Sequence, residues 1–157
     1  MGNYLLKPVY ESIFGNVFRS NYFEDRMQMQ KSIYLLQELG LSVGDYDFKW
    51  YKHGPYSQSL QNDILNSSGI ETVPISYSAD AKVVIEALKA IIFQDGISYD
   101  TCKWLECLGS LHYIKDNLLP SSASTEDVLT ALESRKPHLD CHSDNKKALL
   151  DLEKLFA

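Results

Sequence analysis

The side chains with the greatest capacity for chemistry lie in one short segment, Tyr46 to Tyr56, which reads YDFKWYKHGPY and is followed by Ser57. His53 could act as a general base and Ser57 as a nucleophile, because proton transfer and acyl transfer use these groups. Such a pair needs a third group to orient the histidine, and the nearest acidic residues in sequence are Asp45 and Asp47. No complete catalytic set is visible. We therefore expect no catalytic residues and predict that the protein is not an enzyme.

The same segment is better suited to binding. Aromatic side chains give a large contact area at a low cost in conformational entropy, and the free amides at a helix N-terminus can receive an anion. The predicted partner-binding residues, called the aromatic corner below, are Trp50, His53, Gly54, Pro55, Tyr56 and Ser57. The alternative interpretation is structural: the Gly-Pro pair sets the turn, and the aromatic rings fill the junction between helices.

A second set of residues would contact DNA if the helix after the Gly-Pro pair entered a groove. Amide side chains can read base edges, and lysines can anchor phosphates. The candidate nucleic-acid contacts are Lys49, Lys52, Gln58, Gln61 and Asn62. Two lysines are few for this purpose, and a net charge of −6 gives the chain no general attraction to phosphate. DNA binding is therefore the alternative to a protein partner.

Histidine and cysteine residues elsewhere do not form a set of metal ligands by their spacing. The run HLDCH at 138–142 lacks a second pair of ligands, and a structural zinc site needs four. Cys102 and Cys107 are five positions apart, so they would point roughly 140° apart on a helix. We expect them to be small core or boundary residues, and we expect no metal and no cofactor. A helical stripe predicted to pack in the core comprises Trp104, Leu108, Leu111 and His112.

A mainly helical fold must position these residues. With 157 residues and 45% apolar content, the chain is long enough for one compact domain, which we expect to span 1–157. The apolar spacing predicts helices over 4–18, 26–39, 55–67, from 78 or 80 to 94, 100–114 and 124–133, and a last one from 143 or 144. Alternating residues predict strands over 47–51 and 70–77. The expected class is mainly α (α+β), with a strand–helix–strand centre.

Local signals predict where several helices begin and end. Asp25 can cap the second helix, and Gly40 can stop it in the left-handed conformation. Pro55 is suited to a first helical turn, so we expect the next helix to begin there. Ser124 and Asp127 have the spacing of a capping box.

Cysteine usage and hydropathy bear on the compartment. Three cysteines cannot all pair, and the N-terminal stretch lacks the cationic and continuous apolar parts of a secretion signal. No stretch approaches the roughly 20 apolar residues that a membrane span needs. We therefore expect a cytoplasmic protein without a membrane partner.

Four stretches of the chain resemble a known family. They are KSIYLLQEL at 31–39, YDFKWYKHGPYSQSL at 46–60, WLECLGSLHYI at 104–114, and the Lys-Pro pair at 136–137 before the last helix. The order and content resemble the YwgA-like group of small prokaryotic proteins and, more distantly, the Panacea (SocA-like antitoxin) domain. That domain usually has a small or aliphatic residue after Gly-Pro, where this chain has Tyr56. The residues shared with the family are Lys31, Trp50, His53, Gly54, Pro55, Tyr56 and Ser57.

The resemblance implies a mostly helical domain with a winged-helix-like centre, no established enzymatic activity, and transcriptional or toxin–antitoxin roles. Together with the residue analysis it predicts a non-enzymatic protein-interaction module, antitoxin-like or associated with defence or mobile elements. A winged-helix DNA-binding transcriptional regulator is the alternative. The expected partner is another protein. Homodimerisation stays open, because pairing two copies would double the patch of Lys49 and Lys52 or bury the aromatic corner.

Overall fold

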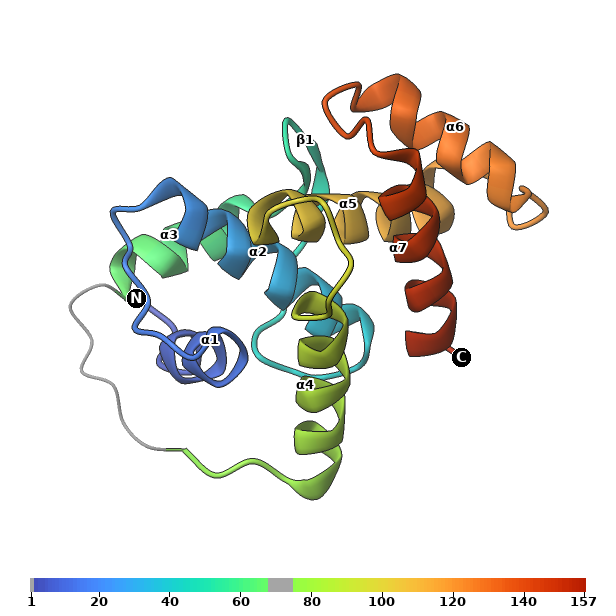
Figure 1. Ribbon diagram of the computed structural model, residues 1–157. Coiled ribbons are helices and arrows are strands. Elements are labelled where there is room, and N and C mark those ends of the chain that lie inside the picture. Colours follow the sequence, from blue (N-terminus) through green and yellow to red (C-terminus); the bar gives the residue numbers. More distant parts are fainter. Residues whose placement is uncertain (1, 68–74) are drawn as a thin grey trace.

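The computed structural model describes residues 2–67 and 75–157, and these ranges form mainly helices with one small sheet (Figure 1). The α-helices are α1 (Leu6–Phe14), α2 (Phe23–Glu38), α3 (Gln58–Asn66), α4 (Ala79–Ile92), α5 (Thr101–Tyr113), α6 (Thr125–Arg135) and α7 (His142–Leu155). A π-helical turn, η1 (Ile114–Leu118), continues α5, and the sheet consists of β1 (Lys49–Tyr51) and β2 (Gly54–Tyr56). The predicted mainly α class with a small β component is confirmed.

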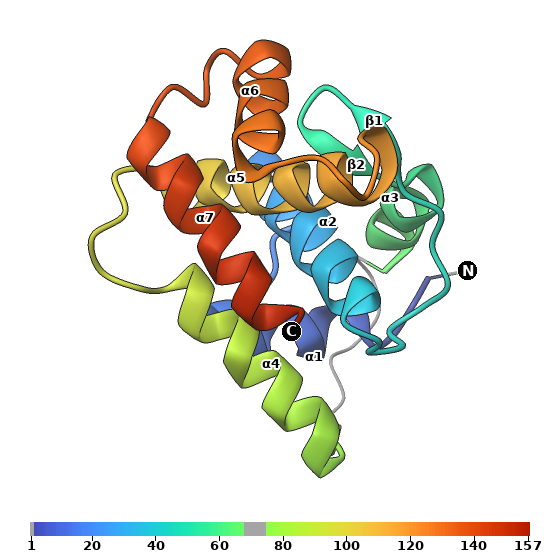
Figure 2. The same cartoon turned by 90° about the vertical axis from the view of Figure 1, so that its right-hand side faces the viewer.

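Helices α2 and α5 form the centre of the molecule. α5 buries every residue from Trp104 to His112, and α2 buries most of its length, as expected for helices that are covered on all sides. The two helices pack against each other, and α7 crosses α5 (Figure 2). Buried side chains of all seven helices join one core cluster among the described residues. The stripe that includes Trp104 and His112 is buried, so its prediction as core is confirmed.

The aromatic corner forms a hairpin, and this corrects the predicted start of the third helix. β1 and β2 pair antiparallel, with Trp50 opposite Pro55. Pro55 is therefore in a strand, where the missing N–H is tolerated at a sheet edge. α3 begins only at Gln58, because Ser57 caps it: the Ser57 hydroxyl accepts a hydrogen bond from the Leu60 amide at 3.2 Å.

The order of strands at the centre also differs from the strand–helix–strand prediction. Both strands of the hairpin precede α3. The second predicted strand, 70–77, falls mostly on residues 68–74, which lie outside the described residues. In the described part of the chain, the centre is a hairpin followed by a helix.

The capping predictions had mixed outcomes. The capping box of Ser124 and Asp127 is present at α6, and Gly40 follows α2 with φ +93°. Asp25 was wrong as a cap of α2. Helix α2 starts at Phe23, three residues earlier than predicted, and buried Asp25 instead receives hydrogen bonds from the Arg19 backbone and guanidinium at 2.9 to 3.1 Å. An ion pair with a residue outside the helix is a contact that local spacing does not reveal.

Two further features follow from these elements. Cys107 is buried and Cys102 is half-buried on α5, as predicted for core or boundary residues. None of the helices in the described ranges is both long and apolar enough to cross a membrane.

A tight contact between the hairpin and α5 leads to the first prediction. Gly54 has φ +91°, and a Cβ there would lie 2.3 Å from Ser110 Oγ. We expect Gly54→Ala to lower the free energy of unfolding by roughly 2–5 kcal/mol, from backbone strain plus the clash. Gly40 has a similar φ and open space around an added Cβ. The control variant Gly40→Ala should therefore lower the free energy of unfolding by only about 1–2 kcal/mol.

Ser110→Ala should relieve the clash, since the nearest remaining side-chain atom would be Cβ at 3.5 Å. Urea denaturation of the two single variants and the double variant measures the coupling. We expect the Gly54→Ala loss to shrink toward that of Gly40→Ala in the Ser110→Ala background. Equal losses in both backgrounds would show that the hairpin does not pack on α5 in this way.

Candidate functional site

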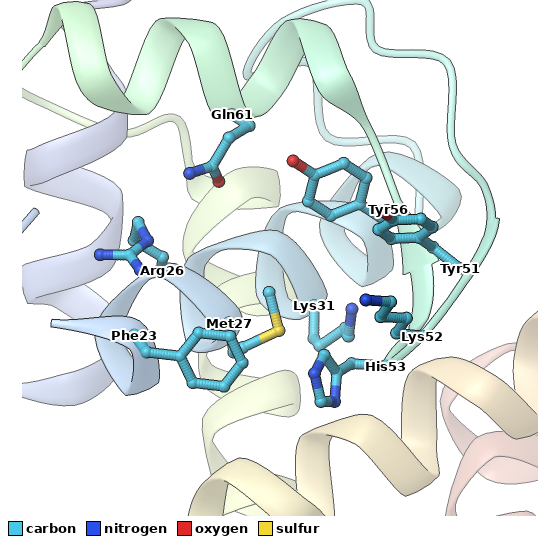
Figure 3. A pocket seen from close by; sticks show the side chains of 9 residues that line it. All are labelled: Phe23, Arg26, Met27, Lys31, Tyr51, Lys52, His53, Tyr56 and Gln61. Atoms are coloured by element: carbon cyan, nitrogen blue, oxygen red, sulfur yellow. The ribbon is translucent and has the colours of Figure 1, made fainter.

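A cavity of about 330 Å³ lies between α2, the hairpin and α3 (Figure 3). Its lining comprises the basic residues Arg26, Lys31, Lys52 and His53, the aromatic residues Phe23, Tyr51 and Tyr56, and Met27 and Gln61. None of the described residues that line it is acidic. We call it the α2–hairpin cavity.

Lys31 of α2 is the lining residue that the fold holds most firmly. It is 1% exposed, and its Nζ donates a hydrogen bond to the Pro55 carbonyl at 2.7 Å. Its side chain passes Gly109 of α5, where an added Cβ would lie 3.6 Å from Lys31 Cδ, an ordinary contact distance. Burial lowers the pKa of Lys31 to about 7, although the negative charge of Glu106 acts in the opposite direction. The ammonium is thus poised to lose its proton near neutral pH.

The residue before Lys31 fixes the next part of the corner. The Gln30 side chain donates to the Ser57 carbonyl at 2.9 Å and accepts from the Ser57 amide at 3.0 Å. Two consecutive residues of α2 therefore hold β2 and the start of α3. Ser57 is fully buried, and its hydroxyl contacts Ser59 as well as capping α3. These contacts occupy Ser57 in a structural role and do not pair it with His53.

A buried carboxylate on α5 connects the hairpin to the segment before α7. Glu106 Oε2 lies 2.8 Å from His138 Nε2 and 3.8 Å from Lys136 Nζ, and Oε1 lies 3.8 Å from His53 Nδ1. The distance to His53 is too long for a hydrogen bond. Burial lowers the pKa of His53, and the charge of Glu106 opposes that shift. Glu106 therefore hydrogen-bonds His138, whereas Lys136 and His53 both lie at the longer distance of 3.8 Å.

The Lys136 side chain holds the hairpin turn between β1 and β2. Its Nζ donates to the carbonyl of Tyr51 at 3.1 Å and to the carbonyl of Lys52, and it lies 5.0 Å from the centre of the Trp50 ring. Burial lowers the pKa of Lys136, while Glu106 acts in the opposite direction. Lys136 thus holds the turn through its backbone carbonyls, and the Lys52 side chain stays exposed to solvent.

The structure divides the predicted aromatic corner into two groups. Gly54, Pro55 and Ser57 are buried, and they shape the corner from inside. His53 and Tyr56 are half-buried and line the α2–hairpin cavity. The sixth residue, Trp50, packs beside Tyr113 with ring centres 5.8 Å apart and does not line this cavity.

The five candidate nucleic-acid contacts do not gather at one cavity. Lys52 and Gln61 line the α2–hairpin cavity, whereas Lys49 and Gln58 line a separate hollow of about 270 Å³. Gln58 donates to Asn62 at 3.1 Å on the exposed face of α3. The two lysines are therefore lining residues of different hollows.

Sequence reasoning missed the contribution of α2 to the cavity. Phe23, Met27 and Lys31 recur at intervals of four, which places them on one helix face. That spacing is visible in the sequence, but it does not reveal that the hairpin covers this face. Phe23 is 49% exposed, and its ring lies 5.2 Å from the His53 ring. Sequence reasoning also missed Glu106. Its position inside the apolar run WLECL is a sign of a buried polar cluster.

Comparisons of the chain with protein-family models, with curated proteins and with solved structures gave no match in any of the three. The resemblance to the YwgA-like group stays a prediction.

The buried amine leads to a pH-dependent prediction. Above pH 7 folded Lys31 loses its proton, while the unfolded chain keeps it up to about pH 10.4. The unfolded state then binds more protons, so the free energy of unfolding should rise with pH. Between pH 7 and 9 the free energy of unfolding should rise by about 2 kcal/mol from this residue, and Lys31→Met should lack that rise.

Urea denaturation at pH 7, 8 and 9 measures the difference between the parent and Lys31→Met. Exposed Lys82 provides the control, and Lys82→Met should keep the parent's pH dependence. Parallel pH profiles for the parent and Lys31→Met would contradict the lowered pKa of Lys31.

Proposed function

We propose that the protein is an interaction module whose α2–hairpin cavity binds an acidic segment of a partner protein. The observation that carries this proposal is the lining: four basic residues and three aromatic residues, with no acidic residue among the described ones. The chain as a whole has a net charge of −6, so this cavity has a basic lining in an acidic protein. A carboxylate-bearing segment is the occupant with complementary charge.

The buried carboxylate of Glu106 hydrogen-bonds His138 at 2.8 Å and lies 3.8 Å from both Lys136 and His53. It makes no hydrogen bond to a described residue that lines the cavity. Lys31, at the cavity wall, has a pKa of about 7, and a bound carboxylate would favour its charged form. Binding of an acidic segment should therefore be coupled to proton uptake by Lys31.

The aromatic residues supply the apolar part of the surface. Tyr51 is 53% exposed and Phe23 is 49% exposed. Each ring is held by a neighbour: Tyr51 lies 5.1 Å from Tyr56, and Phe23 lies 5.2 Å from His53. Rings that are oriented before binding lose little entropy on binding, which suits a protein interface.

Gln61 supplies a hydrogen-bond acceptor on the α3 side of the cavity. Its Oε1 is buried and has no hydrogen-bond partner among the described residues. An unpaired buried acceptor is costly, and a backbone N–H of a bound segment would satisfy it. This supports an extended peptide as the occupant.

The biological setting rests on the resemblance alone. An antitoxin-like or defence-associated module in the cytoplasm agrees with the family that the chain resembles. A non-enzymatic role is supported by the structural engagement of Ser57, which caps α3 and contacts Gln30.

Selection of displayed peptides on the purified protein tests the proposed occupant. We expect enrichment of peptides that contain Asp or Glu beside an apolar residue. Arg26→Glu and Lys52→Glu should each lower the affinity for the selected peptides by about tenfold, because each replaces an attractive charge with a repulsive one. Lys82→Glu, at an exposed position of α4, should have no effect on this affinity. Selected peptides without acidic residues, or equal affinity for Arg26→Glu, would overturn the proposal.

DNA binding through α3 is a second candidate, favoured by the exposed, hydrogen-bonded amides of Gln58 and Asn62 and by Lys49, which lines a hollow together with Gln58. It predicts duplex binding that weakens with salt, and Lys49→Ala should reduce the salt slope by about 1. The measurement is a salt-titrated fluorescence anisotropy assay with a labelled duplex. The absence of binding by folded protein at low salt would remove this candidate.

A further inference from the structure

Three ligand-type side chains lie together away from the residues of the α2–hairpin cavity. Glu38 is the last residue of α2, His112 is in the last turn of α5, and Asp116 is in the π-helical turn η1. One ligand atom from each lies within 4.8 Å of the others. His112 and Asp116 also line a hollow of about 220 Å³.

His112 is held in the orientation of a metal ligand. It is 7% exposed, and its ring stacks on Phe156 with centres 4.3 Å apart. Its Nδ1 lies at 2.9 Å from the Tyr34 hydroxyl. Histidine ligands characteristically bond through one ring nitrogen while the other is fixed by such a contact. This leaves Nε2 for an ion.

Nε2 has no hydrogen-bond partner among the described residues, although it faces a carboxylate. Asp116 Oδ2 lies 3.5 Å from it. Two ligand atoms on a tetrahedral zinc ion are about 3.4 Å apart, given metal–ligand bonds of about 2.1 Å. The separation therefore suits two atoms that share an ion.

The third side chain lies nearer the other ring nitrogen, with Glu38 Oε1 3.8 Å from His112 Nδ1. The ligand atoms of the three residues lie within 4.8 Å of one another, and the Glu38 side chain, which is 34% exposed, has to turn toward Nε2 to join an ion there. Asp116 is 54% exposed. Both carboxylates can thus adjust around an ion, whereas His112 is fixed by its packing.

We propose that Glu38, His112 Nε2 and Asp116 form a binding site for a divalent transition-metal ion such as Zn²⁺. Three protein ligands leave a fourth position for water, as in open zinc sites. One imidazole and two carboxylates favour Zn²⁺ over Mg²⁺ or Ca²⁺, which prefer oxygen ligands alone. The π-helical turn that carries Asp116 is a backbone feature often found at functional sites. A bound ion would join the C-terminal ends of α2 and α5.

Calorimetric titration of the chelator-treated protein with Zn²⁺ tests the site. Cys141 and His142 are adjacent and could bind zinc on their own, so all variants are made in a Cys141→Ser/His142→Gln background. We expect binding of about one ion in this background, and affinity at least about tenfold lower for Glu38→Gln and for Asp116→Asn. Both substituted side chains are partly exposed, so these variants should stay folded, as far-ultraviolet circular dichroism checks. His112→Gln should abolish binding.

Cobalt(II) absorption identifies the ligand atoms. Co²⁺ in this site should show ligand-field bands without a thiolate charge-transfer band, and Zn²⁺, but not Mg²⁺, should displace it. Loss of zinc binding in the Cys141→Ser/His142→Gln background would overturn the proposal, as would unchanged affinity in Glu38→Gln and Asp116→Asn. A thiolate band in the cobalt spectrum would overturn it equally.

Discussion

The hydrogen bond from the Lys31 ammonium to the Pro55 carbonyl is the interaction on which the corner of this protein depends. It places a potential charge inside the core, where burial disfavours it, and at 2.7 Å it gives that charge a partner on the hairpin. Gln30 adds two hydrogen bonds to Ser57, so the same turn of α2 sets the end of β2 and the start of α3. The α2–hairpin cavity exists because these contacts hold the hairpin over one face of α2.

Helix α5 accommodates the hairpin by small residues at the point of contact. Gly109 lies against Pro55 and the Lys31 side chain, and Ser110 lies against Gly54. A Cβ on Gly54 would lie 2.3 Å from Ser110 Oγ, so β2 meets α5 where there is no room for a further side chain on the hairpin. Glu106, one turn earlier on α5, engages Lys136 and so reaches the other side of the hairpin turn. Stability and the shape of the binding surface therefore have the same structural origin.

The parts of the fold that the sequence predicted well are those with local causes. Helix α6 begins where the capping box of Ser124 and Asp127 predicted it, and α5 was predicted from the apolar spacing over 100–114. Strand β2 was not predicted, because Gly54 and Pro55 favour a helix start when read alone. Their strand conformation depends on Lys31 and α5, which are distant in sequence.

The candidate site was predicted in part for the same reason. His53 and Tyr56 were chosen from the density of aromatic residues, and both line the cavity. Phe23 and Arg26 were not chosen, since their role appears only when α2 packs beneath the hairpin. The cluster of Glu38, His112 and Asp116 is carried by three elements, and no sequence spacing links the glutamate to the other two residues.

The protonation of Lys31 joins the structural role of this residue to binding. Carbon-13 labelling of lysine and NMR titration of the Lys31 Cε signal would follow it directly, with Lys31→Met assigning the signal. We predict a pKa of about 7 in the free protein and a higher value when an acidic peptide fills the cavity. A Lys31 signal that titrates near the ordinary value of about 10.4 and does not respond to the peptide would contradict both the buried contact and the acidic occupant.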